Sequence, residues 1–152
     1  MSSFEEELEL NGTLVFTNKG RSMMPLLRQD RDLMVIEKKG PERCKKYDAV
    51  LFKRGGKYVL HRILKVRPND YFIAGDNNCR GESVREEQIL GILKQVVRDG
   101  KTISVEDPGY QCYVHLWCDA YPLRFGLIFL RDKALRAGSR IKRALILLSD
   151  KK

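Results

Sequence analysis

The sequence predicts a mainly β protein: a small, bent β domain with a short N-terminal helix and a C-terminal helical tail. Two observations lead to this prediction. Residues 13–105 contain short β-prone runs separated by turn-forming clusters of Gly, Pro, Asn and Asp. After residue 107 the apolar residues recur instead at steps of three and four, as on one face of a helix. We therefore divide the chain into a β domain, residues 1–107, and a tail, residues 108–152.

The β domain begins with a predicted helix over residues 2–10. Two serines precede acidic residues in its first turn, which is typical of a helix start, and Asn11-Gly12 is a natural stop. The close spacing of the runs that follow favours a strongly bent sheet over alternating strands and helices. The glycine pair at 55–56 predicts a hairpin. Strands are expected over residues 13–17, 32–38, 47–54, 57–66, 70–75, 89–98 and 101–105.

The tail is basic and amphipathic. The chain has a net charge of +9, and residues 121–152 alone carry nine Lys or Arg against two Asp. A helix with one apolar stripe and many cations can lie on an anionic membrane, but the stripe could also dock on the β domain or on a second copy. Pro122 and Gly138 interrupt the segment, so two helices are an alternative to one. The predicted stripe contains Leu127, Leu130, Ala134, Gly138, Ile141, Leu145 and Leu148.

Composition excludes several classes of protein. Hydrophobic residues make up 43% and charged residues 32%, as in an ordinary globular domain. The sequence has no long apolar run and no signal peptide, so we expect a cytoplasmic protein. It also lacks a glycine-rich phosphate loop, which disfavours a nucleotide enzyme. Cys112, His115 and Cys118 have no clear fourth ligand, so we expect no metal and no cofactor.

One of the two histidines lies in a predicted strand. Alternation puts His61 on one face with Val59 and Ile63, a partly apolar setting in which burial favours the neutral imidazole. Such a residue is either a general base or a half-buried structural histidine. Asp76 directly follows the strand 70–75 and could orient the imidazole, although an Asp beside Asn77 and Asn78 is also ordinary turn chemistry.

Three short motifs occur together in a specific order. They contain Gly20, Ser22, Met23 and Pro25, then His61, Arg62 and Ile63, and then Gly75, Asp76 and Asn77. In this order they resemble the type I signal peptidase family, and its serine-histidine branch more closely than its serine-lysine branch. The resemblance extends over residues 13–97, approximately, and the related self-cleaving repressors share the fold.

The resemblance implies a serine endopeptidase that cleaves a precursor or leader peptide through an acyl-enzyme. Ser22 is then the nucleophile, His61 the general base and Asp76 the acid that orients the imidazole, with Glu82 as the reserve acid. Such a serine needs a base within hydrogen-bond reach to take its proton, because its hydroxyl is otherwise a poor nucleophile. Gly20 occupies the position at which serine-lysine enzymes carry an oxyanion-binding hydroxyl, which leaves backbone N–H groups for that task.

The remaining site residues follow from the same resemblance. Met23 and Pro25 are expected to pin the loop that presents Ser22 and to contact the substrate. Lys65 is the base that the serine-lysine branch would suggest. It lies about 13 Å further along the strand than His61, so the two cannot serve the same hydroxyl, and the motif favours His61.

Two other functions stay open. One is a non-catalytic peptide-binding module recruited to a membrane surface, and the other is a repressor-like regulatory protein. We expect no nucleic-acid partner, because no helix-turn-helix segment precedes the β domain and the tail lacks stacking aromatic residues among its cations. The expected partners are a peptide or precursor substrate and, through the tail, the anionic inner surface of a membrane. The oligomeric state is left open.

Overall fold

The computed structural model describes residues 3–17 and 19–149. Its first element is helix α1, Phe4–Asn11, which begins at a capping box. Ser3 Oγ accepts a hydrogen bond from the Glu6 N–H at 3.2 Å, and Glu6 Oε2 accepts one from the Ser3 N–H at 2.9 Å. The helix ends at Gly12, whose φ of +69° suits a residue without a side chain. The predicted N-terminal helix is confirmed.

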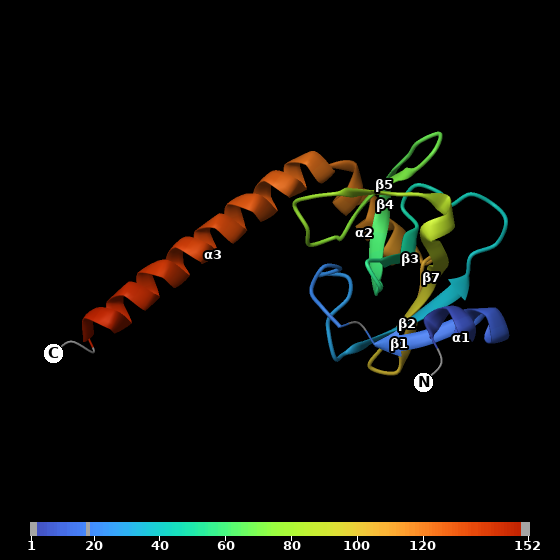
Figure 1. Cartoon of the computed structure of the whole chain (residues 1–152), viewed down its shortest axis with the longest axis horizontal. Helices are drawn as coiled ribbons and strands as arrows, with labels where there is room; N and C mark the ends of the chain where they lie inside the picture. Colours follow the sequence, from blue (N-terminus) through green and yellow to red (C-terminus); the bar gives the residue numbers. More distant parts are fainter. Residues whose placement is uncertain (1–2, 18, 150–152) are drawn as a thin grey trace.

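The body of the protein is one antiparallel sheet of eight strands (Figure 1). The strand order is β1-β2-β7-β3-β4-β5-β6, with β8 beside β7; within the described residues the two ends of this order do not pair, so the sheet stays open. The mainly β fold is therefore confirmed, while β6 and the 3₁₀ turn η1 were not predicted. The strands are β1 Thr13–Thr17, β2 Asp32–Lys38, β3 Ala49–Arg54, β4 Lys57–Val66, β5 Tyr71–Ala74, β6 Glu82–Val84, β7 Ile89–Arg98 and β8 Lys101–Ser104, and η1 is Glu86–Gln88.

Apolar residues cover both sides of the sheet. On β3, Leu51 packs in one core cluster, while its neighbours Val50 and Phe52 pack in a second cluster. Successive side chains of a strand point to opposite faces, so this alternation separates the two clusters. On β4 the second cluster includes Ile63, which lies on the same face as His61. An irregularity in the pairing of β4 with β5 follows Ile63 and ends the simple alternation before Lys65.

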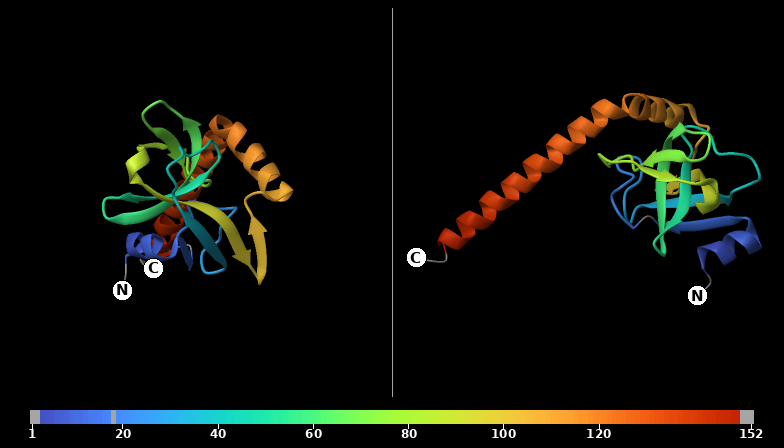
Figure 2. Two further views of the ribbon diagram at one scale, coloured as in Figure 1. Left: turned by 90° about the vertical axis from the view of Figure 1, so that its right-hand side faces the viewer. Right: turned by 45° about the horizontal axis from the view of Figure 1, so that its top comes forward.

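Two helices complete the chain. Helix α2, Pro108–Asp119, buries Tyr110, Val114 and Cys118 at four-residue steps, in a cluster that also contains residues of β4 and β5. Helix α3, Tyr121–Ser149, stays near the domain over its first turns and then extends away from it (Figures 1 and 2). The predicted helical tail is confirmed as two helices.

The break between these helices lies at Ala120 and not at Pro122 or Gly138. Pro122 is in the first turn of α3, where its missing N–H removes no helical hydrogen bond. Gly138 lies inside the continuous helix, since a single glycine lowers helix propensity without ending a helix.

The apolar stripe of α3 does not dock on the β domain. Leu127 is 69% exposed and Leu130 is 62% exposed, whereas Arg124 and Ile128 are the buried ones among the α3 side chains that the structure describes. The side chains of Ile141, Leu145 and Leu148 lie outside the described part of the structure. Among the described residues, no helix combines the length and the apolar character that a membrane span needs.

Candidate active site

His61 lies in the middle of β4, paired with Val50 of β3, and is 4% exposed. Its Nδ1 lies 3.1 Å from Oε1 of Glu82, and its ring is 5.9 Å from that of Phe52. Burial lowers the pKa of His61 below its ordinary value, and this effect outweighs the nearby carboxylate of Glu82, which raises it. The imidazole is therefore neutral at pH 7 and can accept a proton.

Glu82 is the carboxylate that contacts His61. It is the first residue of β6, and Arg54 at the end of β3 holds it, with Nη1 2.8 Å from Oε1 and 2.9 Å from Oε2. An acceptor at Nδ1 favours the tautomer that carries its proton there. The lone pair of Nε2 is then free to take a proton from a hydroxyl group.

Asp76 does not make the contact that was predicted for it. Arg62 donates two hydrogen bonds of 2.9 Å to the Asp76 carboxylate, and Tyr113 Oη donates a third, also of 2.9 Å. Arg62 and Asp76 are both fully buried. Because Arg62 follows His61 on the strand, its side chain points to the opposite side of the sheet, and Asp76 pairs with it there. The prediction that Asp76 orients the imidazole is therefore wrong, and the reserve residue Glu82 occupies that place.

Ser22 lies in the loop between β1 and β2, and this loop is fastened to the turn after β5. Asn77 donates its backbone N–H to the Ser22 carbonyl at 2.7 Å and its side-chain amide to the Arg21 carbonyl at 3.0 Å. Gly75 makes this approach possible, because a Cβ atom there would lie 2.5 Å from the Ser22 carbonyl oxygen. The first and third motifs therefore meet in space through their backbones.

Met23 and Pro25 differ in how the structure places them. Met23 is fully buried in the core cluster that contains Leu14 and Leu60, so it anchors the loop but is closed to a substrate. Pro25 is exposed and is not among the described residues that line the pocket containing Ser22. The expected substrate contact is therefore wrong for Met23, whose burial agrees with an anchoring role, and it stays a prediction for the exposed Pro25.

Ser22 and His61 line one pocket of about 420 Å³. Arg54, Tyr58, Asn78 and Glu82 contribute to its wall as well. Within the described residues no direct hydrogen bond joins Ser22 to His61. Instead, Asn78 Nδ2 lies 3.5 Å from His61 Nε2 and so faces the lone pair that a general base would use. The pocket thus combines a hydroxyl, a neutral imidazole and a positioned carboxylate, the groups required for acyl transfer.

The other candidate residues lie elsewhere. The Lys65 side chain is exposed, with Nζ 5.8 Å from the centre of the Tyr121 ring, away from the pocket. Cys118 is buried against the sheet and Cys112 is exposed, so the two thiols of the C-x-x-H-x-x-C spacing face different surroundings on α2. The residues described include no group of three or more His, Cys, Asp or Glu arranged to hold a metal ion.

Several residues of the pocket wall were not predicted, and Asn78 and Arg54 are the two that contact His61 or Glu82. Asn78 directly follows the third motif, and this position was the signal in the sequence that could have identified it as a site residue. Arg54 ends a strand before the hairpin at 55–56, and nothing in its local sequence marks it as a partner of Glu82. Comparison with known proteins adds no assignment: no family model and no curated sequence matches this chain.

Proposed function

We propose that this chain is a serine endopeptidase of the signal-peptidase-like type, with Ser22 as nucleophile, His61 as general base and Glu82 as the residue that positions the imidazole. The observation that carries the proposal is the shared pocket of Ser22 and His61, with His61 Nδ1 held at 3.1 Å by Glu82. The order of the three motifs, which resembles the serine-histidine branch of type I signal peptidases, supports it independently.

In the proposed reaction Ser22 Oγ attacks the scissile carbonyl carbon while its proton passes to His61 Nε2. The imidazolium then gives this proton to the departing amine, and the acyl-enzyme remains. Water repeats the sequence on the acyl-enzyme, releasing the carboxylic acid and restoring Ser22. Ser22 has to displace the Asn78 amide from Nε2, a local side-chain movement of the kind that substrate binding often completes. The Ser22 backbone N–H is the proposed oxyanion donor.

A fluorophosphonate probe tests this chemistry without knowledge of the substrate. The wild-type protein should be labelled on Ser22, with loss of fluoride, and Ser22→Ala and His61→Ala should each abolish labelling. Ser139→Ala is the matched control, since Ser139 is an exposed serine on α3, remote from the pocket. Equal labelling of the wild type and Ser22→Ala would show that the pocket does not activate its serine.

Peptide binding without cleavage is the second candidate function. The observation that favours it is that no hydrogen bond joins Ser22 and His61 within the described residues, although both line the pocket. Under this function the domain would hold a peptide, and the probe would label neither Ser22 nor any other residue of the pocket. A repressor-like role in regulation is a weaker candidate, since it rests on the shared fold of the resembling families alone.

The proposed setting is the cytoplasm, with α3 lying on the anionic inner surface of a membrane. Two features of α3 support the membrane contact: the exposed leucines Leu127 and Leu130, and the exposed cations on its other faces. Apolar side chains that enter the acyl boundary together with cations that meet acidic headgroups are the pattern of an interfacial helix. The proposed substrate class is a precursor or leader peptide.

A further inference from the structure

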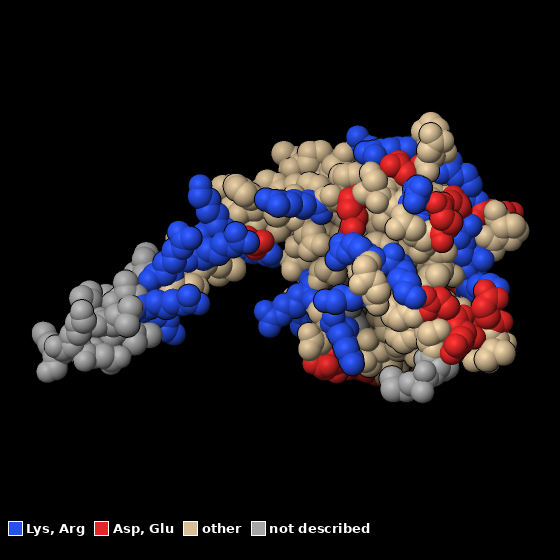
Figure 3. All heavy atoms as spheres, in the orientation of Figure 1, with Lys and Arg blue, Asp and Glu red and all other residues tan. Residues whose placement is uncertain are grey.

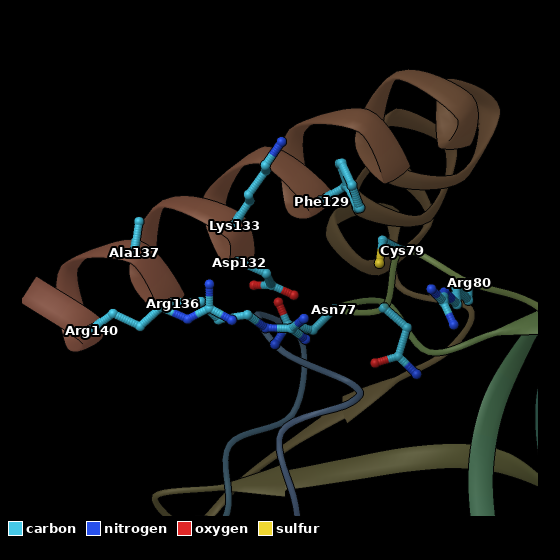
Figure 4. A pocket seen from close by; sticks show the side chains of 10 residues that line it. Asn77, Cys79, Arg80, Phe129, Asp132, Lys133, Arg136, Ala137 and Arg140 are labelled. Atoms are coloured by element: carbon cyan, nitrogen blue, oxygen red, sulfur yellow. The ribbon is translucent and has the colours of Figure 1, made fainter.

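A second depression lies beside the catalytic pocket, between α3 and the turn at residues 77–80. It is a groove of about 760 Å³. One wall is the turn, and the other is the face of α3 that carries Phe129, Lys133, Arg136 and Arg140 (Figure 4). Arg131 of α3 fastens the two walls together, because its Nη1 donates to Asn77 Oδ1 at 2.8 Å.

The groove is strongly cationic. Arg80, Lys133, Arg136 and Arg140 line it, and Asp132 is the acidic residue of its wall. Arg131 pairs with Asp132 at 2.7 Å, so this carboxylate is already neutralised by a neighbour. In residues 3–17 and 19–149 no carboxylate pairs with any of the four lining cations. Figure 3 shows Lys and Arg gathered along the part of α3 that extends from the β domain.

The groove is continuous with the catalytic pocket. Asn78 and Arg80 line both of them, and Asn78 is also the residue that approaches His61 Nε2. A chain that runs from Ser22 past this turn therefore enters the groove directly. From Phe129 to Arg140 the helix rises about 16 Å, which matches roughly five residues of extended peptide.

We propose that the groove binds an acidic segment of the peptide substrate, on one side of the scissile bond; this inference rests on the proposed peptidase function. Four cations without acidic partners call for an anionic occupant, and the continuity with the Ser22 pocket identifies that occupant as part of the same peptide. The substrate class is thus a precursor with about four to six residues rich in Asp or Glu near its cleavage site.

A membrane is a less suitable occupant of this groove. Leu130 and Arg136 are six residues apart, or about 1.7 helical turns, so their side chains point to different sides of α3. A bilayer that receives the leucine stripe would leave the concave cationic groove turned toward the β domain. The two surfaces of α3 therefore have separate partners, lipid for the stripe and peptide for the groove.

The test uses full-length Ser22→Ala protein, which binds without cleaving, and fluorescein-labelled hexaglutamate as the probe. Fluorescence anisotropy should show hexaglutamate binding that weakens as salt rises, and no binding of a neutral Gly-Ser hexapeptide. Arg136→Glu with Arg140→Glu should weaken the binding of hexaglutamate about tenfold or more, because each reversal replaces an attraction by a repulsion. Lys101→Glu with Lys142→Glu is the matched control: both lysines are exposed, lie outside the groove lining and change the net charge equally.

Three outcomes would overturn the inference. The first is that hexaglutamate does not bind, and the second is that the groove and control variants lose affinity equally, which would indicate general charge attraction. The third is that the groove variant keeps hexaglutamate binding but loses flotation with phosphatidylglycerol vesicles, which would assign the groove to a membrane. Fluorophosphonate labelling of the wild type reports on the peptidase separately, so failure of the proposed function and failure of the groove are distinguishable. Thermal unfolding of both variants checks that they fold.

Discussion

At the scale of single residues, His61 and Arg62 show how adjacent positions on one strand serve two purposes. His61 faces the pocket and contacts Glu82, while Arg62 faces the other side of the sheet and pairs with Asp76. The second motif contains His61 and Arg62 and the third contains Asp76, and the structure separates their contacts. His61 belongs to the candidate site, whereas the Arg62–Asp76 pair joins β4 to the turn after β5 and, through Tyr110 and Tyr113, to α2.

Glu82→Gln should impair the candidate base and shift its titration. The Glu82 charge raises the pKa of His61, so removing it should lower this pKa further. A general base works in its neutral form, so the acid limb of kcat/KM should move to lower pH, while kcat falls on the order of 100-fold through lost positioning. NMR titration of His61 measures the shift directly, with His115 as an internal reference.

Glu87→Gln is the control for that experiment, because Glu87 is exposed and pairs with Arg85 on the surface. It should leave the His61 titration unchanged. Arg54→Gln should shift the pKa of His61 in the opposite direction. The charge of Arg54 lowers this pKa, so its loss should raise it. A His61 titration that is the same in Glu82→Gln and in the wild type would show that Glu82 does not act on the imidazole.

Asp76→Asn should destabilise the fold more than any exposed acid substitution. It leaves the Arg62 guanidinium buried without its carboxylate, which costs about 3–5 kcal/mol in the free energy of unfolding. Asp70→Asn is the control, since its partner Arg67 is exposed and their 3.5 Å contact should contribute at most about 1 kcal/mol. Urea denaturation measures both. A loss below about 1 kcal/mol for Asp76→Asn would contradict the structural role of the pair.

At the scale of elements, α3 carries several exposed large apolar side chains, among them Leu127, Leu130 and Leu135. Its first turns pack through Phe125 and Ile128, and its stripe points away from the domain. Local periodicity could identify the stripe, but could not tell what it faces, because the same pattern suits a protein core, a dimer and a membrane.

Leu127→Asp with Leu130→Asp should abolish membrane attachment without disturbing the fold. Both side chains are exposed in the monomer, and burial of each leucine in the acyl boundary is worth about 1.5–3 kcal/mol, so the affinity for anionic vesicles should fall at least about 100-fold. Flotation with vesicles of phosphatidylglycerol and phosphatidylcholine is the measurement.

Leu10→Asp with Leu116→Asp makes the same chemical change at exposed leucines of α1 and α2, and should leave flotation within about twofold of the wild type, allowing for the added negative charge. An equal loss of vesicle flotation in both double variants would show that the α3 stripe is not the membrane contact. A wild-type dimer that the α3 variant converts to monomer, together with absent flotation, would assign the stripe to a second copy of the chain.

At the scale of the whole molecule, the open sheet brings distant segments to one place. Three segments meet around the pocket: the Ser22 loop, the centre of β4 and the turn after β5. Helix α3 adds the cationic wall of the neighbouring groove. The strand runs and both helical regions could be predicted, because each depends on local alternation or spacing, whereas the anchoring of the Ser22 loop by Met23 was expected from the resemblance. The short strand β6 could not, since its three residues carry too little pattern to stand out, and it is this strand that supplies Glu82.

The sequence by itself determined the capped N-terminal helix, the alternating strands and the basic amphipathic tail, because periodicity and capping depend on neighbouring residues. The resemblance of its three motifs suggested the candidate pairing of Ser22 with His61. Only the tertiary structure decided which carboxylate contacts His61. Asp76 is 14 residues from its partner Arg62, and Glu82 is 21 residues from its partner His61. Which of the two carboxylates meets His61 therefore depends on the side of the bent sheet that each loop reaches. The same folding decided that Leu127 and Leu130 of α3 are exposed while Lys133, Arg136 and Arg140 line the groove beside the pocket.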